Sequence, residues 1–146
     1  MHKRISNLAA PLTALGLVLL IGGCNRAESP QKVQNDVASA RQDAAEKTAE
    51  AQRDAQQDVQ SQQNDLNRKA GDAGEDVASA SRDVNQAQAE GDYKVAMANA
   101  DGQHKVAIEK CEAMSGTAQK SCKDKADADY KVAKDKADAE RTRRKG

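Results

Sequence analysis

The sequence has little of what the core of a compact enzyme is built from. It contains no Trp, no Phe and only two Tyr in 146 residues. Hydrophobic residues make up 38% of the chain, but 28 of its residues are Ala, whose side chain buries little apolar surface. After Cys24 the large apolar side chains are eight Val, two Met, two Tyr, one Leu and one Ile. Because so few cannot offset the entropy lost on ordering a compact domain, we expect neither an enzyme nor a small-molecule substrate.

Patterns that bind metals, cofactors or nucleic acids are also scarce. His104 is the only His after Cys24, and the chain has no CxxC pair, so a zinc site lacks ligands. We find no Ser or Asp that would be held in a pocket around His104 to form a catalytic triad. No Gly-rich phosphate loop follows a strand, and two Tyr offer no platform for stacking bases. We therefore expect no cofactor, no metal and no nucleic-acid partner.

The first residues have the layout of a secretory signal. Lys3 and Arg4 precede an apolar run over residues 8–21. The run is shorter than the roughly 20 residues that span a bilayer, and Pro11 interrupts it, so a retained transmembrane helix is the weaker interpretation. We expect residues 1–23 to be a cleaved signal peptide.

Residues 21–24, Ile-Gly-Gly-Cys, resemble the lipobox of bacterial lipoproteins. The resemblance implies that the thiol of Cys24 is diacylated, that the chain is cleaved before it, and that residues 24–30 form a lipidated tether to the membrane. An ordinary cleaved signal is the alternative. In such lipoproteins Asp after the Cys favours the inner membrane. Asn25 stands there instead, which implies the periplasmic face of the outer membrane, with the inner membrane as the less favoured location.

Cys111 and Cys122 are the cysteines that remain once Cys24 carries lipid. In an oxidising compartment a leftover pair is most simply a disulfide. Reactive or metal-bound thiols are the alternatives, and they lack the CxxC spacing that such sites use.

Small and apolar residues recur every eleven positions in the first half. Steps of four, three and four place them on one stripe of a helix, and eleven residues in three turns make that helix nearly straight. Ser29 and Pro30 are suited to its N-cap and first position. We expect an extended Ala-rich helix over 31–85, kinked by glycines near 71–74. The stripe is Val33, Val37, Ala40, Ala44, Thr48, Ala51, Ala55, Val59, Gln62, Leu66, Ala70, Ala73, Val77, Ser81 and Val84.

The second half repeats the same period. The unit GDYKVAMANAD at 91–101 is followed by GQHKVAIEKCE at 102–112. Two apolar stripes start at the cysteines, and Ser115 and Gly116 between them suit a C-cap and turn. We expect residues 86–146 to form an antiparallel helical hairpin, stapled by Cys111–Cys122, with Tyr130 opposite residues 103–104. The predicted fold is therefore all-α, a long extended helix followed by a disulfide-closed hairpin.

The two halves of the chain differ in net charge. Residues 25–92 carry net −6 and residues 93–146 carry net +4, which predicts an acidic stalk near the anchor and a basic hairpin at the far end. The basic tail (Arg141, Arg143, Arg144 and Lys145) is a candidate contact for anionic lipid head groups or cell-wall carboxylates; a solvated helix end favoured by the helix dipole is the alternative. Helical i,i+4 pairs are expected at Asp43–Lys47, Asp65–Lys69, Asp127–Lys131 and Glu140–Arg144.

Three further resemblances concern function. The segment HKVAIEKCEAMSGTAQKSCKDKADADYKVAK at 104–134 resembles small Ala- and Lys-rich proteobacterial periplasmic proteins, some with Tol-type names, whose cysteines bracket a Ser-Gly turn. This resemblance implies a protein of the cell envelope and no more specific role.

The design of the first half, a lipidated Cys followed by a long helix, is similar to that of murein lipoproteins. Those run in heptads and end on the Lys joined to peptidoglycan, whereas this chain runs in elevens and ends Lys145-Gly146, which argues against covalent attachment. Eleven-residue Ala/Lys-rich helices also resemble late-embryogenesis-abundant proteins, which implies disorder in dilute solution.

Two functional hypotheses follow from the sequence. The first is a lipid-anchored structural protein of the cell envelope that self-associates or binds a helical envelope partner, because an Ala stripe allows close helix approach but cannot hold a lone helix. The second is a stress-protective shield, disordered in its first half.

Overall fold

The described part of the chain forms three long helices. The computed structural model describes residues 27–71 and 77–145. Helix α1 covers Pro30–Gly71, α2 covers Val77–Cys111 and α3 covers Gly116–Lys145, and the described residues form no strand. The predicted all-α class, with a long first helix and a disulfide at the helical hairpin, is confirmed.

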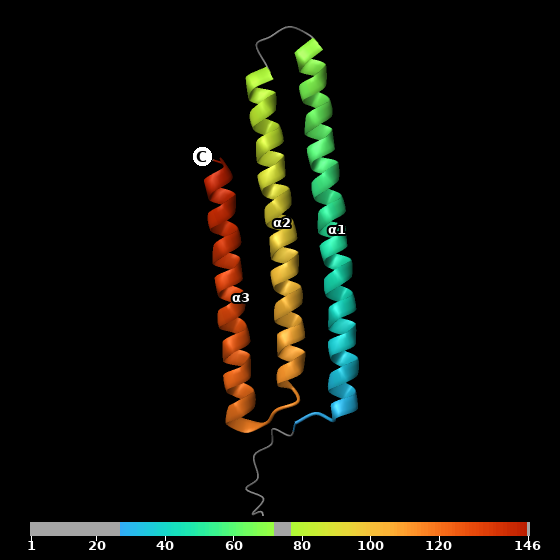
Figure 1. Ribbon diagram of the computed structural model, residues 1–146, viewed down its shortest axis with the longest axis vertical. Coiled ribbons are helices and arrows are strands. Elements are labelled where there is room, and N and C mark those ends of the chain that lie inside the picture. Colours follow the sequence, from blue (N-terminus) through green and yellow to red (C-terminus); the bar gives the residue numbers. More distant parts are fainter. Residues whose placement is uncertain (1–26, 72–76, 146) are drawn as a thin grey trace, which may run out of the picture.

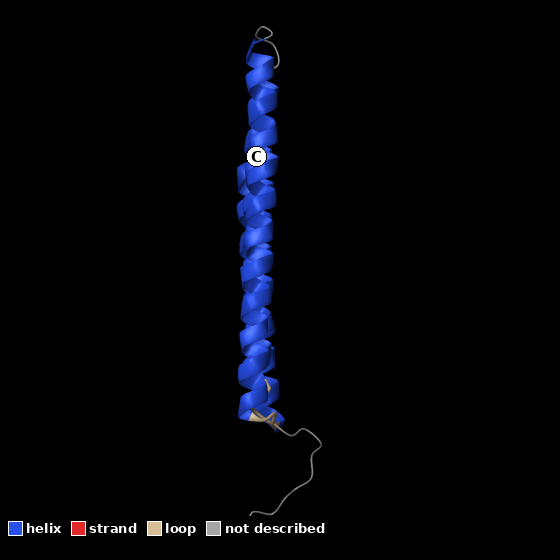
Figure 2. Cartoon of the chain, turned by 90° about the vertical axis from the view of Figure 1, so that its right-hand side faces the viewer, coloured by secondary structure: helices blue, strands red, loops and turns tan. Residues whose placement is uncertain are grey.

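The helices lie side by side in a single layer (Figure 1). Helix α2 is in the middle, and α1 and α3 pack against it from opposite sides without touching each other. When the molecule is turned by 90°, the helices lie one behind another (Figure 2). Because the layer is one helix thick, α2 is the only one of the described helices that buries two opposite faces.

The range 31–85, which we expected to form one extended helix, is divided in the structure. Helix α1 ends at Gly71, and α2 starts at Val77 and runs back antiparallel to α1 (Figure 1). Part of the predicted kink, including Gly74, lies outside the described residues. The physical reason for the reversal is that a stripe of Ala, Val and Thr stabilises a helix only when it packs on another helix.

Glycines of α2 allow α1 to approach closely. Gly91 and Gly102 are eleven residues apart, are buried, and face Ala55 and Ala44, which are also eleven apart. A Cβ at Gly91 would lie 2.7 Å from the Cβ of Ala55, and one at Gly102 would collide with that of Ala44. Ala80, eleven residues before Gly91, is 2% exposed. The eleven-residue period therefore sets the register of α1 on α2.

The opposite face of α2 packs on α3 with the same period. Ala89, Ala100 and Cys111 are buried and eleven residues apart. Ala89 lies beside Ala137 of α3, and Ala100 lies beside Ala126. The predicted hairpin and its facing stripes are thereby confirmed.

The helix ends follow their local sequence. Ser29 caps α1, because its Oγ accepts a hydrogen bond from the amide of Lys32 at 3.3 Å. Residues 112–115 form the turn between α2 and α3. Gly116 adopts a φ of 61°, a left-handed conformation that favours Gly. The predicted Gly thus lies at the turn, but it opens α3, since α2 has already ended at Cys111.

Candidate functional site

The predicted lipidation site, Cys24, lies outside the described residues, but the structure shows where the chain following it enters the fold. The backbone amide of Glu28 donates a hydrogen bond of 2.9 Å to the carbonyl oxygen of Glu112, in the turn between α2 and α3. The disulfide-closed end of the hairpin therefore lies beside the start of α1. The expectation that the hairpin lies far from the start of the long helix is wrong, because α2 folds back along α1 and brings the closed end of the hairpin beside Glu28.

Cys111 and Cys122 form the predicted disulfide, with their Cα atoms 5.7 Å apart. Cys111 is 1% exposed and ends α2. The bond thus covalently closes the end of the layer beside which the chain enters.

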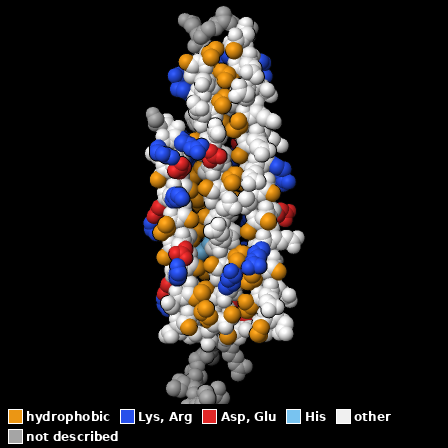
Figure 3. Space-filling model, in the orientation of Figure 1, with side chains coloured by type: hydrophobic (Ala, Val, Ile, Leu, Met, Phe, Trp, Pro, Cys, Tyr) orange, Lys and Arg blue, Asp and Glu red, His pale blue; other side chains and the backbone are white. Residues whose placement is uncertain are grey.

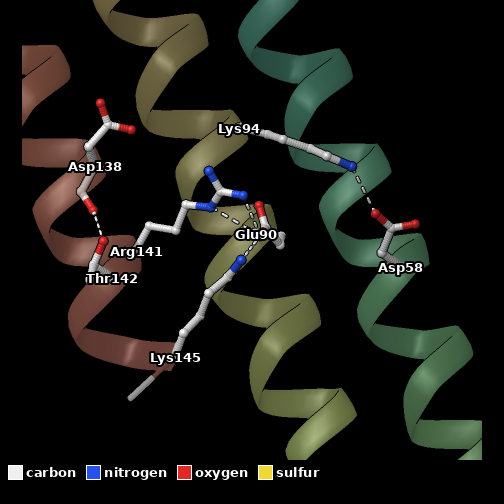
Figure 4. A network of polar contacts seen from close by, with 7 residues as sticks. All are labelled: Asp58, Glu90, Lys94, Asp138, Arg141, Thr142 and Lys145. Atoms are coloured by element: carbon white, nitrogen blue, oxygen red, sulfur yellow. Dashed lines mark hydrogen bonds and ion pairs between the residues drawn. The ribbon is translucent and has the colours of Figure 1, made fainter.

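The four cations of the basic tail are all engaged in ion pairs. Arg141 contacts Glu90 of α2 at 2.7 Å, and Lys145 binds the same carboxylate (Figure 4). The guanidinium of Arg141 also lies 4.7 Å from the centre of the Tyr93 ring. The remaining pairs are Arg144 with Asp92 and Arg143 with Glu140. The tail therefore fastens the end of α3 to α2, a role that sequence analysis missed.

The two cations that bind Glu90 also change the pKa of its carboxyl group. The hydrogen bonds from Arg141 and Lys145 lower the pKa of the Glu90 carboxyl below its ordinary value, because both cations favour the charged form. Figure 4 shows the two cations reaching from α3 to this one side chain of α2. Glu90 is thus the point at which the tail is held.

The contact at Glu90 is one of three polar contacts spaced by eleven residues between α2 and α3. The hydroxyl of Tyr130 donates to Asp101 at 2.7 Å, and the side-chain amide of Gln119 donates to Glu112 at 2.7 Å. The acids occupy positions 90 and 101 of α2 and position 112 just after its end, and their partners occupy 141, 130 and 119 of α3. The duplicated units visible in the sequence therefore build a repeated connection along the hairpin.

His104 lies within this connection. Its ring centre is 4.9 Å from that of Tyr130, which confirms that Tyr130 lies opposite residues 103–104. Nε2 of His104 lies 2.6 Å from Oδ1 of Asp127. Asp127 reaches His104 from α3 across the hairpin, and its carboxylate is mostly exposed to solvent. The hydrogen bond from Tyr130 to Asp101 raises the pKa of the Tyr130 hydroxyl.

In three of the four predicted i,i+4 pairs, one member contacts a neighbouring helix instead. Asp43 binds Lys105 at 2.5 Å, and Asp58 binds Lys94 at 3.0 Å, so acidic residues of α1 face basic residues of α2 at these positions. Lys105 lowers the pKa of Asp43. Among the other predicted pairs, Asp65 contacts Arg68, Asp127 contacts His104, and Arg144 contacts Asp92. The helix surface alone did not reveal these partners because they depend on how the chain folds back.

One broad face of the α1–α2 pair carries a shallow groove with few charges, which we call the neutral groove. Its larger part, about 670 Å³, is lined by Ala, Thr, Gln, Asn, Gly and Val side chains, with Arg41 and Lys110 as its only charged lining residues. A second part of about 450 Å³ is lined by α1 residues one repeat further along, and its only charged residue is Asp92. In Figure 3 the strip between α1 and α2 is mostly white and orange, while blue and red gather along α3 and the outer edges.

The described part of the chain contains no cluster of three or more His, Cys, Asp and Glu side chains suited to holding a metal ion. None of its helices combines the length and the apolar character needed to cross a membrane.

Comparison with known proteins found no matching protein-family model, no matching curated sequence and no matching solved structure.

Proposed function

We propose that this protein is a lipid-anchored, non-enzymatic structural component of the cell envelope, attached through Cys24 to the periplasmic face of the outer membrane. Its role is that of a helical spacer that holds an interaction surface away from the membrane. The observation that carries the proposal is the packing of α1 along α2, in which Gly91 and Gly102 fit against Ala55 and Ala44. This packing gives the chain a fixed length and direction.

The geometry supports a spacer because the chain enters at one end. Glu28 contacts the turn at Glu112, so the tether over 24–30 starts beside the disulfide-closed end. At 1.5 Å per residue, the 42 residues of α1 are about 63 Å long. A lipid on Cys24 would therefore leave the far tips of α1 and α2 about 60 Å from the anchored end.

In this proposal the basic tail has a structural role within the chain. Its four cations bind acids of the same chain. We therefore assign it first to fastening α3, and contact with peptidoglycan or anionic head groups requires those pairs to open.

The test of the anchor is metabolic labelling of cells with palmitate, followed by separation of inner and outer membranes. We expect label in the wild-type chain and none in Cys24→Ala, with the labelled protein in the outer-membrane fraction. Cys111→Ser is the matched control, because it removes a thiol without touching the lipidation motif. Equal labelling of Cys24→Ala and wild type would contradict the anchor.

The alternative function, a stress-protective shield that is disordered in dilute buffer, makes a different prediction. The close Gly–Ala contacts of α1 with α2 favour a folded chain over it. Far-UV circular dichroism separates the two. We expect strong helicity with a cooperative thermal transition in dilute buffer, and a coil spectrum that becomes helical only on drying would support the shield.

A further inference from the structure

We propose that the turn between α2 and α3 contacts the membrane that carries the lipid anchor, with the side chain of Met114 in the head-group layer. The inference rests on the proposed function and names the part of the chain that touches the bilayer. The layer of helices then stands upright on its disulfide-closed end.

The first argument is the short length of chain between the anchor and the turn. Glu28 is held at the turn, because its backbone amide donates to the carbonyl oxygen of Glu112 at 2.9 Å. Cys24 precedes Glu28 by four residues, and four residues span at most about 14 Å when fully extended. The head-group layer on each side of a bilayer is itself about 5–8 Å thick. A lipid on Cys24 therefore holds the turn at or near the head groups.

The second argument is the composition of the segment at this end. Residues 113–118, Ala-Met-Ser-Gly-Thr-Ala, carry no charge in a chain that is 32% charged, and all six are exposed. Met114 is 43% exposed, and among the described residues only Val132 is a second exposed large hydrophobic residue. Val132 follows Lys131, which binds Asp135 of the same helix at 2.6 Å, so its surroundings are charged. An exposed apolar side chain in an uncharged segment is suited to the boundary between water and acyl chains.

The third argument is that the two acids where the chain enters are paired within the protein. The carboxylate of Glu112 binds the ammonium of Lys123 at 2.6 Å, and that of Glu28 binds Lys32 at 2.7 Å. An unpaired carboxylate at this end would be repelled by anionic head groups. Because both acids have a cation of their own, this repulsion is reduced.

Lysines flank the uncharged segment on both sides. Lys110 precedes it and Lys120 follows it, and both are exposed. Lys120 also binds Asp124 of its own helix at 2.7 Å. At a membrane boundary a Lys side chain lays its apolar stem along the acyl chains and keeps its ammonium among the phosphates. An apolar residue between two lysines therefore matches a phospholipid surface.

The contact gives the proposed spacer its direction. The start of α1 and the turn lie at the same end of the layer, whereas α1 ends and α2 starts at the opposite end (Figure 1). A lipid tether alone leaves the layer free to tilt. A second point of attachment at Met114 restrains the tilt and directs the far tips of α1 and α2 away from the membrane.

The test uses single tryptophans, because the chain contains none of its own. Met114→Trp and Val132→Trp are expressed from the full-length sequence, purified with their lipid, and placed in vesicles of phosphatidylethanolamine and phosphatidylglycerol. In half of the samples the acyl chains carry bromine near the head group, which quenches tryptophan only at short range. Val132 is the matched control, since it is 68% exposed and lies well inside α3, about 24 Å beyond Gly116.

We expect the Met114→Trp chain to lose most of its emission in brominated vesicles and the Val132→Trp chain to keep it. Matching circular dichroism spectra would show that neither substitution disturbs the helices. Equal emission of Met114→Trp in brominated and unbrominated vesicles would overturn the contact. Quenching of both chains would show that the layer lies flat on the membrane, and this also overturns the proposal.

A second comparison removes the affinity of tryptophan itself for the membrane boundary. The reporter is Thr117→Trp, which is combined either with the native Met114 or with Met114→Asp. Both chains carry the same tryptophan, so a difference between them reports on Met114 alone. We expect quenching with the native residue and a clear loss of quenching with Met114→Asp. Equal quenching in the two chains counts against a role for Met114.

Flotation of the same vesicles separates this inference from the proposed function. A chain that floats with the vesicles without quenching at position 114 contradicts the contact and leaves the anchor in place. A chain that does not float contradicts the anchor, and with it the contact that the anchor positions.

Discussion

Gly102 of α2 lies so close to Ala44 of α1 that position 102 has no space for a side chain. Gly91 and Ala55 repeat this relationship one eleven-residue unit away. The distance between α1 and α2 is therefore fixed by two glycines, and large apolar side chains have little part in it.

Gly102→Ala should destabilise the protein, although Ala is the better helix former. The added Cβ collides with Ala44, and an overpacked contact of this kind costs about 1–3 kcal/mol in the free energy of unfolding. Gly71→Ala is the matched control, because nothing lies within 4 Å of its added Cβ, and it should be neutral or stabilising by up to about 1 kcal/mol. Urea unfolding followed by circular dichroism measures both variants.

A compensating variant tests the mechanism of this effect. Ala44→Gly makes room for the new Cβ, so combining it with Gly102→Ala should recover part of the lost stability. If the double variant is less stable than the sum of both single changes predicts, the steric explanation fails.

Reduction of the Cys111–Cys122 disulfide should lower the stability of the hairpin. In the chain-entropy model a loop with a sequence separation of 11 contributes somewhat less than about 3 kcal/mol. The measurement is thermal unfolding with and without a reductant. Cys111→Ser with Cys122→Ser is the control, because the reductant should leave its midpoint unchanged.

Arg141→Ala should loosen the end of α3 more than Arg143→Ala does. Arg141 joins α3 to Glu90 and covers the Tyr93 ring, whereas Arg143 pairs only with Glu140 of its own helix. Hydrogen exchange of the last α3 turns measures the effect, and we expect faster exchange in Arg141→Ala. Equal exchange in the two variants would show that the tail does not fasten the helix.

The same contact should respond to pH. The pKa of Glu90 is lowered in the folded protein from its ordinary value of 4.5, so its contribution to stability is present above that value. This contribution is lost as the pH falls through the lower folded pKa, because the protonated carboxyl no longer binds Arg141 and Lys145. The protection factors of the α3 end, corrected for the intrinsic exchange rate at each pH, should therefore fall below about pH 4. Glu90→Gln should exchange faster at neutral pH and lose this part of the acid response.

The local features of the fold follow from the sequence. The eleven-residue spacing predicted the helices, Ser29 and Pro30 predicted the start of α1, and the stripes starting at Cys111 and Cys122 predicted the hairpin. These features depend on residues close in sequence or on one periodicity, which a helix converts directly into a shared face.

The packing of α1 on α2 was not predicted, for a physical reason. The close contact of α2 with α1 is made at Gly91 and Gly102, which have no side chain that would mark a buried face in the sequence. Only their size distinguishes them, and small size matters only where a second backbone approaches. The contact Asp43–Lys105 was missed for the same reason, since it joins α1 and α2, whose alignment had not been established.

A layer that is one helix thick has consequences for how the protein unfolds. Helix α3 shares no core with α1, so its loss removes only one of the two helix interfaces and leaves the other unchanged. The molecule then resembles a short repeat array, in which stability is a sum of neighbouring contacts. We therefore expect unfolding in two stages, the α3 interface opening independently of the α1–α2 interface, so that a single midpoint does not describe the stability of the whole chain.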